Sequence, residues 1–256
     1  MSKIFTFVLQ VNFQFLQMNI ALIGYGRMGQ AVEKMALQRG HQVVLRITSA
    51  NKEEMNKENL QKADVAIEFT GPESGKSNVL QCLGAGIAVV SGTTGWNESV
   101  EDAAEVAHNN NTAFLYASNF SIGVNLFLEI NKHLAALMNN HPEYDVTIEE
   151  THHTHKKDAP SGTAITLAEQ ILQNMSRKNQ WRLNDMSNEK AIPILANRVG
   201  NVPGTHKINY SSAIDDIQIS HIAHNRDGFA QGAVLAAEYI TGRQGVFYMR
   251  DVLGIK

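Results

Sequence analysis

A glycine-rich turn near residue 24 joins a short buried strand to a helix, and few folds contain such a junction. Residues 20–23 form a continuous apolar run, as a strand inside a parallel sheet requires. The turn Gly24-Tyr25-Gly26-Arg27-Met28-Gly29 follows at once. Residues 30–38 then have helical spacing, and Gly40 ends the helix. In this context the glycine pattern indicates a dinucleotide-binding fold.

The three glycines of this turn have different expected roles. Gly24 permits the tight turn, Gly26 lets a pyrophosphate approach the backbone, and Gly29 lets the helix pack closely on the strand. Arg27 either pairs with the phosphates or is solvated. A purely structural turn is the alternative. Because the turn lies directly between a strand and a helix, we expect residues 24–29 to contact a dinucleotide.

Strands and helices alternate through the first half of the chain. Apolar runs predict further strands at residues 43–47, 64–69, 87–90 and 112–116, and helices are predicted at residues 77–85 and 100–107. This alternation predicts an α/β fold, a Rossmann-type doubly wound parallel sheet with helices on both faces.

The pattern changes near Asn119 and predicts a second, α+β domain with an open mixed sheet. Its predicted strands are residues 145–150, 192–198, 205–211 and 214–223, its predicted helices are residues 124–138 and 164–175, and residues 176–190 are expected to form a polar loop. A last helix is predicted at residues 231–240. The expected segments are an extension outside the fold (1–17), the dinucleotide-binding domain (18–119), the substrate-binding and oligomerisation domain (120–228) and a helical return to the first domain (229–256).

Composition argues against several classes of protein. The formal net charge of −3 and the lack of a long Lys/Arg run argue against a nucleic-acid partner. No uninterrupted apolar stretch reaches about 18 residues, so no membrane span is expected. Cys82 is the only cysteine, which fits a buried thiol in a cytoplasmic protein.

The first 17 residues loosely resemble a signal peptide, because Lys3 precedes an apolar stretch. However, Gln10 and Asn12 interrupt that stretch, and no Ala-x-Ala cleavage site follows. We therefore expect Met18 to be the functional start of the chain.

The second predicted strand lacks a residue that dinucleotide-binding domains often have. An acidic side chain is expected near its end to bind the adenosine ribose, but residues 46–50 contain none, and Thr48 stands roughly in its place. Thr48 is therefore the expected contact at this point. With Arg46 and Lys52 nearby there is room for a 2′-phosphate, so NADH and NADPH both remain open as cofactors.

Two further turns follow predicted strands. Gly92-Thr93-Thr94-Gly95 follows the fourth strand, and Ala117-Ser118-Asn119-Phe120 follows the fifth. Ligands of open parallel sheets bind at the carboxyl ends of the strands, so both turns are expected to contact the cofactor. The alternative for Gly92 and Gly95 is a structural role in the turn.

The segment from His152 to Thr163 combines acid–base groups with an anion site. It contains three histidines and two lysines within residues 152–157, followed by the turn Pro160-Ser161-Gly162-Thr163 and the apolar-periodic run 164–175. Histidine exchanges protons near neutral pH, and a helix start offers backbone N–H groups to a carboxylate or phosphate. The segment therefore predicts an active site for a small acidic molecule.

Metal binding by His152, His153 and His155 is the main alternative for this segment. The adjacent lysines repel a cation, and the carboxylate or cysteine clusters usual in metal sites are absent. We therefore expect no metal.

The segment His152-His153-Thr154-His155-Lys156-Lys157-Asp158-Ala159-Pro160-Ser161-Gly162-Thr163-Ala164 resembles the signature of the 4-hydroxy-tetrahydrodipicolinate (dihydrodipicolinate) reductase family of bacterial lysine biosynthesis. The turns at residues 24–29 and 92–95, the segment 119–124 and the pattern Arg226-x-x-Phe229-Ala230-x-Gly232-Ala233 match other motifs of that family in order. The resemblance covers about residues 18–256. Ser118, where the family often has proline, and the missing acid near Thr48 depart from it.

The resemblance implies an NADH- or NADPH-dependent oxidoreductase of lysine and diaminopimelate biosynthesis, a cytoplasmic homotetramer acting on a small dicarboxylate. It implies that His152 donates or accepts a proton, that Lys156 donates one, and that His153 contacts the substrate. Ser161, Gly162 and Thr163 are then expected to hold a substrate carboxylate. Contacts to the dinucleotide are implied for residues 24–29, 92–94 and 117–120.

Two other functions remain open at this point. A dinucleotide domain alone does not imply chemistry, so a non-catalytic dinucleotide sensor is one alternative. A dehydrogenase of another small acid, of the aspartate or homoserine type, is the other.

Overall fold

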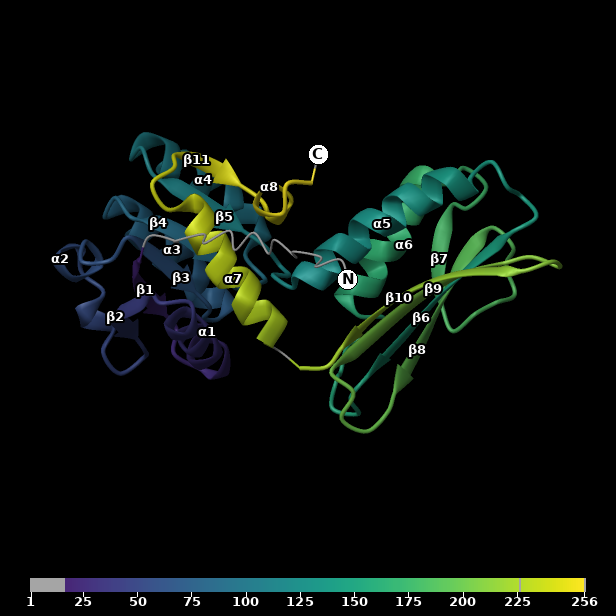
Figure 1. Ribbon diagram of the computed structural model, residues 1–256, viewed down its shortest axis with the longest axis horizontal. Coiled ribbons are helices and arrows are strands. Elements are labelled where there is room, and N and C mark those ends of the chain that lie inside the picture. Colours follow the sequence, from purple (N-terminus) through teal and green to yellow (C-terminus); the bar gives the residue numbers. More distant parts are fainter. Residues whose placement is uncertain (1–16, 226, 256) are drawn as a thin grey trace, which may run out of the picture.

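The computed structural model describes residues 17–225 and 227–255. The chain forms two lobes, each built around its own sheet, and helix α7 returns from the second lobe to the first (Figure 1). The expected extension at residues 1–17 lies, except for Gln17, outside the described residues, as does Arg226 of the C-terminal motif. Among the described helices, none is long and apolar enough to cross a membrane.

The first sheet has six strands, and every described pair in it is parallel. In spatial order the strands are β11 (Gly245–Phe247), β5 (Ala113–Tyr116), β4 (Ala88–Ser91), β3 (Val65–Glu68), β1 (Asn19–Ile23) and β2 (Gln42–Ile47). The predicted Rossmann-type sheet is therefore confirmed. The strand order reverses between β1 and β3, and ligands of open parallel sheets bind at the carboxyl ends of the strands at such a point.

Helices cover both faces of this sheet, because its strands are apolar on both sides. On one face lie α1 (Arg27–Gln38) and α7 (Asp227–Ile240), and the apolar residues between them and the sheet form the first core. On the other lie α2 (Lys57–Leu60), α3 (Pro72–Gly84) and α4 (Val100–Asn109). The Cys82 side chain is fully buried in the core on this second face.

The second sheet has five strands of mixed direction, as predicted. In spatial order they are β10 (Asp216–Ala223), β9 (Gly204–Ser211), β6 (Asp145–His152), β8 (Ala191–Arg198) and β7 (Gln180–Leu183). Burial alternates along β6 and β9, so every second residue faces a core. Helices α5 (Ile122–Met138) and α6 (Gly162–Asn174) pack on that face, whereas no described element covers the opposite face.

Two parts of the second half differ from the prediction. Residues 176–190 are predicted to form a loop, but β7 lies within them, because Trp181 packs on the core between the second sheet and its helices and the strand pairs with β8. Lys178 before it is buried, and its ammonium group donates to the carbonyl oxygens of Glu189 and Ala191. The helical return at residues 229–256 also contains β11 and the short helix α8 (Met249–Val252).

Gly232 brings α7 against the connection between the lobes. A Cβ atom at this position would lie 1.8 Å from the carbonyl oxygen of Phe120 and 2.8 Å from its carbonyl carbon. Phe120 is itself buried in the first core and packs edge-on against Phe69. Only glycine therefore allows α7 to lie this close to the segment that leads into α5.

The substitution Gly232→Ala should destabilise the protein by about 1–3 kcal/mol, because the new methyl group overlaps main-chain atoms that cannot move independently. Gly84→Ala is the matched control, since Gly84 also lies in a helix but has no atom within 4 Å of its Cβ position. Alanine is the better helix former, so this control should be neutral or slightly stabilising. Thermal unfolding measures both variants, and equal midpoints would contradict the close approach.

Candidate active site

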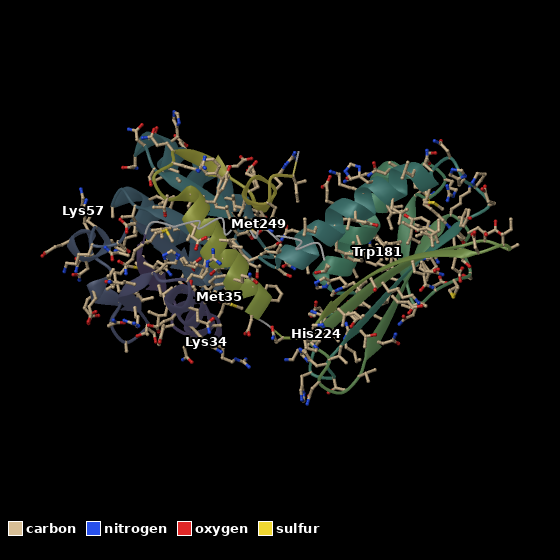
Figure 2. The ribbon with its side chains drawn as sticks, in the orientation of Figure 1. Lys34, Met35, Lys57, Trp181, His224 and Met249 are labelled. Atoms are coloured by element: carbon tan, nitrogen blue, oxygen red, sulfur yellow. The ribbon has the colours of Figure 1, made fainter. Side chains whose placement is uncertain are left out.

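A cleft of about 1180 Å³ lies between the two lobes, and residues from both line it. Figure 2 labels His224, at the end of β10, and Met249, in the lobe of the first sheet, which both line the cleft. The turns after β4 and β5 contribute Thr94 and the segment 117–119. The predicted catalytic segment contributes the residues that follow: His152, His153, Lys156, Ser161, Gly162 and Thr163. The cleft thus brings all of the predicted catalytic and substrate residues together with predicted cofactor residues of the turns after β4 and β5.

A second cavity of about 550 Å³ lies at the reversal point between β1 and β3. Gly24, Tyr25 and Gly26 line one side, and Thr48 and Ser49 line the other. The first turn of α1 opens here without a side-chain cap or an acidic residue. Unpaired N–H groups at a helix start attract an anion, so this cavity fits the phosphates and adenosine of a dinucleotide.

The glycines of the first turn have the geometry that such a ligand needs. Gly24 has a φ of +93°, and a Cβ there would lie 2.1 Å from the Phe69 carbonyl oxygen. A Cβ at Gly29 would lie 2.2 Å from the carbonyl oxygen of Gly24. By contrast, nothing lies within 4 Å of the Cβ position of Gly26, which leaves open space beside its backbone. Arg27 is exposed at the helix start, and Met28 packs partly against the first core.

The end of β2 presents hydroxyl groups and one lysine to the second cavity. The Thr48 hydroxyl donates to Asn51 at 2.8 Å, and Lys52 also lines the cavity. Arg46 is engaged elsewhere: its guanidinium donates to Glu33, which also accepts from the Tyr25 hydroxyl. No carboxylate lines this cavity among the described residues. The ribose end is therefore neutral to positive, which is compatible with either dinucleotide.

Glu68 is a buried carboxylate that the sequence did not reveal as part of the site. It ends β3 and accepts hydrogen bonds from the hydroxyls of Ser91 at 2.6 Å, Thr93 at 2.7 Å and Thr70. The Thr93 hydroxyl also accepts from the Thr70 N–H at 2.7 Å. This network holds together the turns that follow β3 and β4, so the Thr93 side chain acts within the protein, and its carbonyl oxygen accepts from the Trp96 ring N–H at 2.7 Å.

Two other residues predicted to contact the cofactor, Gly92 and Phe120, pack against the protein interior. A Cβ at Gly92 would lie 2.0 Å from the Phe69 ring, so this glycine accommodates the ring. The Phe120 side chain lies in the first core, as described above. Thr94 and Ser118 are exposed in the cleft, and Ala117 and Asn119 are partly exposed there.

The start of α6 forms an anion site on the second lobe. Ser161 caps the helix, since its hydroxyl accepts from the Ala164 N–H at 3.3 Å. The Ser161 N–H donates to Glu150 at 3.0 Å. Among the described residues, no partner occupies the N–H groups of Gly162 and Thr163, which open on the cleft. They can therefore bind a carboxylate.

The acid–base groups surround this helix start. His152 ends β6 and is buried, with its Nδ1 3.2 Å from a carboxylate oxygen of Glu150. The Lys156 ammonium group contacts both carboxylate oxygens of Asp158 at 2.8 Å, and this ion pair lowers the pKa of the Asp158 carboxyl group. His153 lines the same cleft. The rings of His153 and His155 lie 6.3 Å apart, and His155 itself is exposed.

Two histidines of this site escaped the sequence analysis. His206 on β9 lies opposite Glu150 on β6, and its Nε2 is 3.1 Å from the Ser161 hydroxyl. His221 pairs with His206 from β10, and its ring meets the Cβ position of Gly123 at 2.9 Å. Each lies two residues from an inward-facing isoleucine, Ile208 or Ile219, and so on the same face of its strand; the period of two along each strand could have located both histidines.

Burial shapes the charges of this cluster. Desolvation, together with the neighbouring His152, lowers the pKa of His206 to about 4, so its ring is neutral at pH 7. Desolvation opposes ionisation of Glu150, but contacts from His152, Ser161 and Arg198 outweigh it and lower the pKa of the carboxyl group to about 2. Desolvation also lowers the pKa of His221.

Glu150, His152 and His206 could meet around a cation, because one ligand atom of each lies within 4.8 Å of the others. However, the Arg198 guanidinium already donates to Glu150 at 3.1 Å. A fixed positive charge at the carboxylate disfavours a metal ion there. The absence of a metal stays a prediction.

The chain matches a known family over almost all of its length. A model of the dihydrodipicolinate reductase N-terminus matches residues 18–120, and a model of the C-terminus of the same enzyme matches residues 123–253. This chain belongs to the dihydrodipicolinate reductase family. The 4-hydroxy-tetrahydrodipicolinate reductase of Christiangramia forsetii is 49% identical over 238 residues, which are 92% of this chain and 98% of that protein. The enzyme of the same name from Methanoculleus marisnigri is 36% identical over 77% of this chain and 78% of that protein.

Members of this family have the same two-lobed fold. The dipicolinate-bound dihydrodipicolinate reductase of Paenisporosarcina sp. TG-14 has a TM-score of 0.76 at 24% identity, over 91% of this chain and 98% of that one. An amine dehydrogenase of Mycobacterium smegmatis is more distant, with a TM-score of 0.58 at 9% identity over 90% of this chain and 94% of that one. At such identities the similarity establishes the fold.

Acid should destabilise the protein in two steps. Folding lowers the pKa of His206 from 6.5 to about 4. Between these pH values the unfolded chain binds a proton at His206 and the folded chain does not. The free energy of unfolding therefore falls as the pH falls through this window. Below pH 4.5 the lowered pKa of Glu150 adds a second loss, which continues to about pH 2.

The variant His206→Asn should reduce the loss in the first window by up to about 3 kcal/mol, since each pKa unit corresponds to about 1.4 kcal/mol. Thermal midpoints between pH 7 and 4 measure this effect. His133→Asn, at a side chain that is 77% exposed, is the control and should retain the wild-type slope. The same slope in both variants would mean that His206 titrates normally.

Proposed function

We propose that this protein catalyses the reduction of 4-hydroxy-tetrahydrodipicolinate to tetrahydrodipicolinate, with loss of water and at the expense of NADH or NADPH. The observation that carries the proposal is the cleft, where the dinucleotide turns of the first lobe face His152, Lys156 and the start of α6. Family membership supports it, as do curated relatives named for this activity. The reaction belongs to lysine and diaminopimelate biosynthesis, and we place the protein in the cytoplasm.

In this proposal the lobes divide the work. Residues 18–119 hold the dinucleotide, residues 120–228 hold the substrate and form the oligomer interface, and residues 229–256 return to the first lobe. Substrate and hydride donor must then meet in the cleft between the lobes, where the protein fixes their distance and orientation.

The second cavity and the cleft together fit a nicotinamide dinucleotide. The open backbone at Gly26 and the uncapped start of α1 suit its phosphates, and the turns with Thr94 and Asn119 lie where its other end would reach the cleft. When bound, the reduced nicotinamide supplies the hydride. The residues of this chain bind and orient both molecules and handle the protons.

The substrate is a cyclic dicarboxylate, so the site must bind two negative charges and move protons. The Gly162 and Thr163 N–H groups hold one carboxylate, with Ser161 shaping the turn around them. After water is lost, the ring contains a conjugated C=N group. Hydride addition sends negative charge toward the ring nitrogen, where Lys156, with His152, delivers the balancing proton. His153 contacts the substrate from the same segment.

Two observations disfavour the two alternative functions. A dinucleotide sensor needs neither the acid–base cluster nor the anion site at α6. A dehydrogenase of another small acid, of the aspartate or homoserine type, is disfavoured by membership of the reductase family. We expect no resident metal and no nucleic-acid or membrane partner.

His152→Ala and Lys156→Ala should each lower kcat by about 10²–10⁴-fold, as expected for loss of a positioned acid or base. The measurement is oxidation of NADH and of NADPH with the dihydrodipicolinate synthase product as substrate. Lys157→Ala is the matched control, because this neighbouring lysine is exposed and does not line the cleft. Wild-type turnover in both active-site variants would contradict these roles, and dinucleotide binding without turnover in the wild type would favour a sensor.

We also propose that the protein is a homotetramer assembled through the uncovered face of the second sheet. That face carries Leu195, which pairs with Glu149, and the exposed Ile222. Exposed apolar residues on the open face of a sheet mark a surface for association. In a homo-oligomer, other copies of the chain cover that face.

Ile222→Asp should therefore lower the mass of the assembly, because it places a charge in the proposed interface. Leu137→Asp is the control, since this leucine is 68% exposed but lies on α5, which covers the opposite face of the sheet. Sedimentation velocity measures both. A tetramer in both variants, or a monomeric wild type, would refute this interface.

A further inference from the structure

Glu150 lies in β6 between the two chemical parts of the candidate site. Its side chain is fully buried, and it stands two residues before His152 on the same face of the strand. Arg198, at the end of the neighbouring strand β8, donates to its Oε1 at 3.1 Å. A buried carboxylate is costly unless it is paired, so the fold retains this charge by supplying a cation.

The two oxygens of Glu150 face different functional groups. Oε1 accepts the Ser161 N–H at 3.0 Å and so fixes the turn that starts α6. Oε2 lies 3.2 Å from the Nδ1 of His152 and 3.9 Å from the Nε2 of His206. Neither Oε2 nor the Nδ1 of His152 has an aligned hydrogen bond to another described group. One carboxylate therefore contacts both the anion site and the proton-exchanging histidine.

This contact distinguishes the two nitrogens of His152. A ring nitrogen that faces a carboxylate keeps its proton, so the proton of the neutral ring belongs on Nδ1. Nε2 is then left as the exchanging nitrogen. It points toward Gly204, a cleft residue whose missing Cβ would lie 3.1 Å from Nε2. Glycine at this position keeps the Nε2 edge of the ring accessible.

We propose that Glu150 is a positioning residue for the reduction: it orients the His152 ring with Nδ1 protonated and Nε2 toward the substrate, and it fixes the carboxylate-binding turn at Ser161. This role rests on the function proposed above. Glu150 does not touch substrate; it acts through His152 and through the start of α6.

Other charged and titratable groups face this cluster from each neighbouring element. His206 comes from β9, with its ring 5.1 Å from that of His152, and His221 comes from β10 beside it. Lys156 lies in the following loop, where Asp158 pairs with it. Arg198 comes from β8. Arg198 offsets the charge of Glu150, and Asp158 offsets that of Lys156. The rings of His206 and His221 are uncharged, so they add bulk to the cluster rather than charge.

Glu150→Gln tests the proposal, because the amide oxygen can still accept from Ser161 while the charge beside His152 is lost. We expect kcat to fall about 10-fold or more, with KM changing by less than about 3-fold. The ¹⁵N spectrum of histidine-labelled protein should change as well. The neutral His152 ring, assigned by the loss of its signals in His152→Gln, should shift from the Nδ1–H form toward the Nε2–H form, because the amide NH2 group then faces Nδ1.

Glu238→Gln is the matched control. Glu238 is also a buried glutamate bound by an arginine and a histidine, at 2.6 Å from Arg39 and 2.8 Å from His41, but it lies on α7 and lines neither cavity. It should retain wild-type kcat to within about 2-fold, although both variants lose a buried ion pair.

Wild-type kcat and an unchanged His152 spectrum in Glu150→Gln would overturn the proposal. If this variant does not fold, Glu150→Asp decides: it keeps the charge but withdraws it from His152, so an intermediate kcat and a partial change of the spectrum support the role, and wild-type values of both refute it. The spectra are recorded without substrate, so they test Glu150 even if the wild type proves inactive, which would instead refute the proposed function.

Discussion

The main-chain contact between Phe120 and Gly232 determines how the two lobes meet. The chain leaves the first lobe after β5 through the segment that contains Phe120, builds the second lobe, and returns in α7, where Gly232 lies against the Phe120 carbonyl oxygen. The two connections are therefore locked together on the first lobe. Because the segment just before Phe120 lines the cleft, this contact also sets where the cofactor turns stand relative to His152.

Two buried glutamates organise the two halves of the site in the same way. Glu68 gathers the hydroxyls of the turns after β3 and β4, and Glu150 gathers a helix start, a histidine and an arginine. In each case one carboxylate, with up to four acceptor positions, replaces several separate contacts. Such networks are rigid only when their donors are complete, so each glutamate depends on residues from different elements.

The sequence predicted the parts of this protein that depend on local rules. The turn at Gly24 needs a positive φ and close backbone contacts, and both requirements are visible as glycines at fixed spacing. The start of α6 was visible because Ser161 is a helix cap followed by an apolar-periodic run. Strand β7 was missed because it is four residues long within a polar stretch, and it pairs with β8 only through the tertiary fold.

The rest of the site depends on contacts between distant residues, which local patterns do not encode. His206 and His221 belong to the site only because β9 and β10 pair beside β6. Thr93 lies in the turn after β4, as predicted, but its hydroxyl donates to Glu68, a residue 25 positions away. For Thr93 the residue type suggested a polar contact, whereas the partner was set by the topology.

The pairing of Arg46 with Glu33 has a consequence for how the adenosine end of the first lobe handles charge. With that guanidinium held by a carboxylate, Lys52 is the cation that lines the second cavity among the described residues. An ammonium group is a point charge on a flexible stem, without the planar, two-pronged grip of arginine. Its attraction for a phosphate in an open cavity is screened within about 8 Å at physiological salt. A phosphate at this end would therefore meet a charge whose pull depends on ionic strength, whereas the glycine turn beside it offers open backbone and the N–H groups of the α1 start.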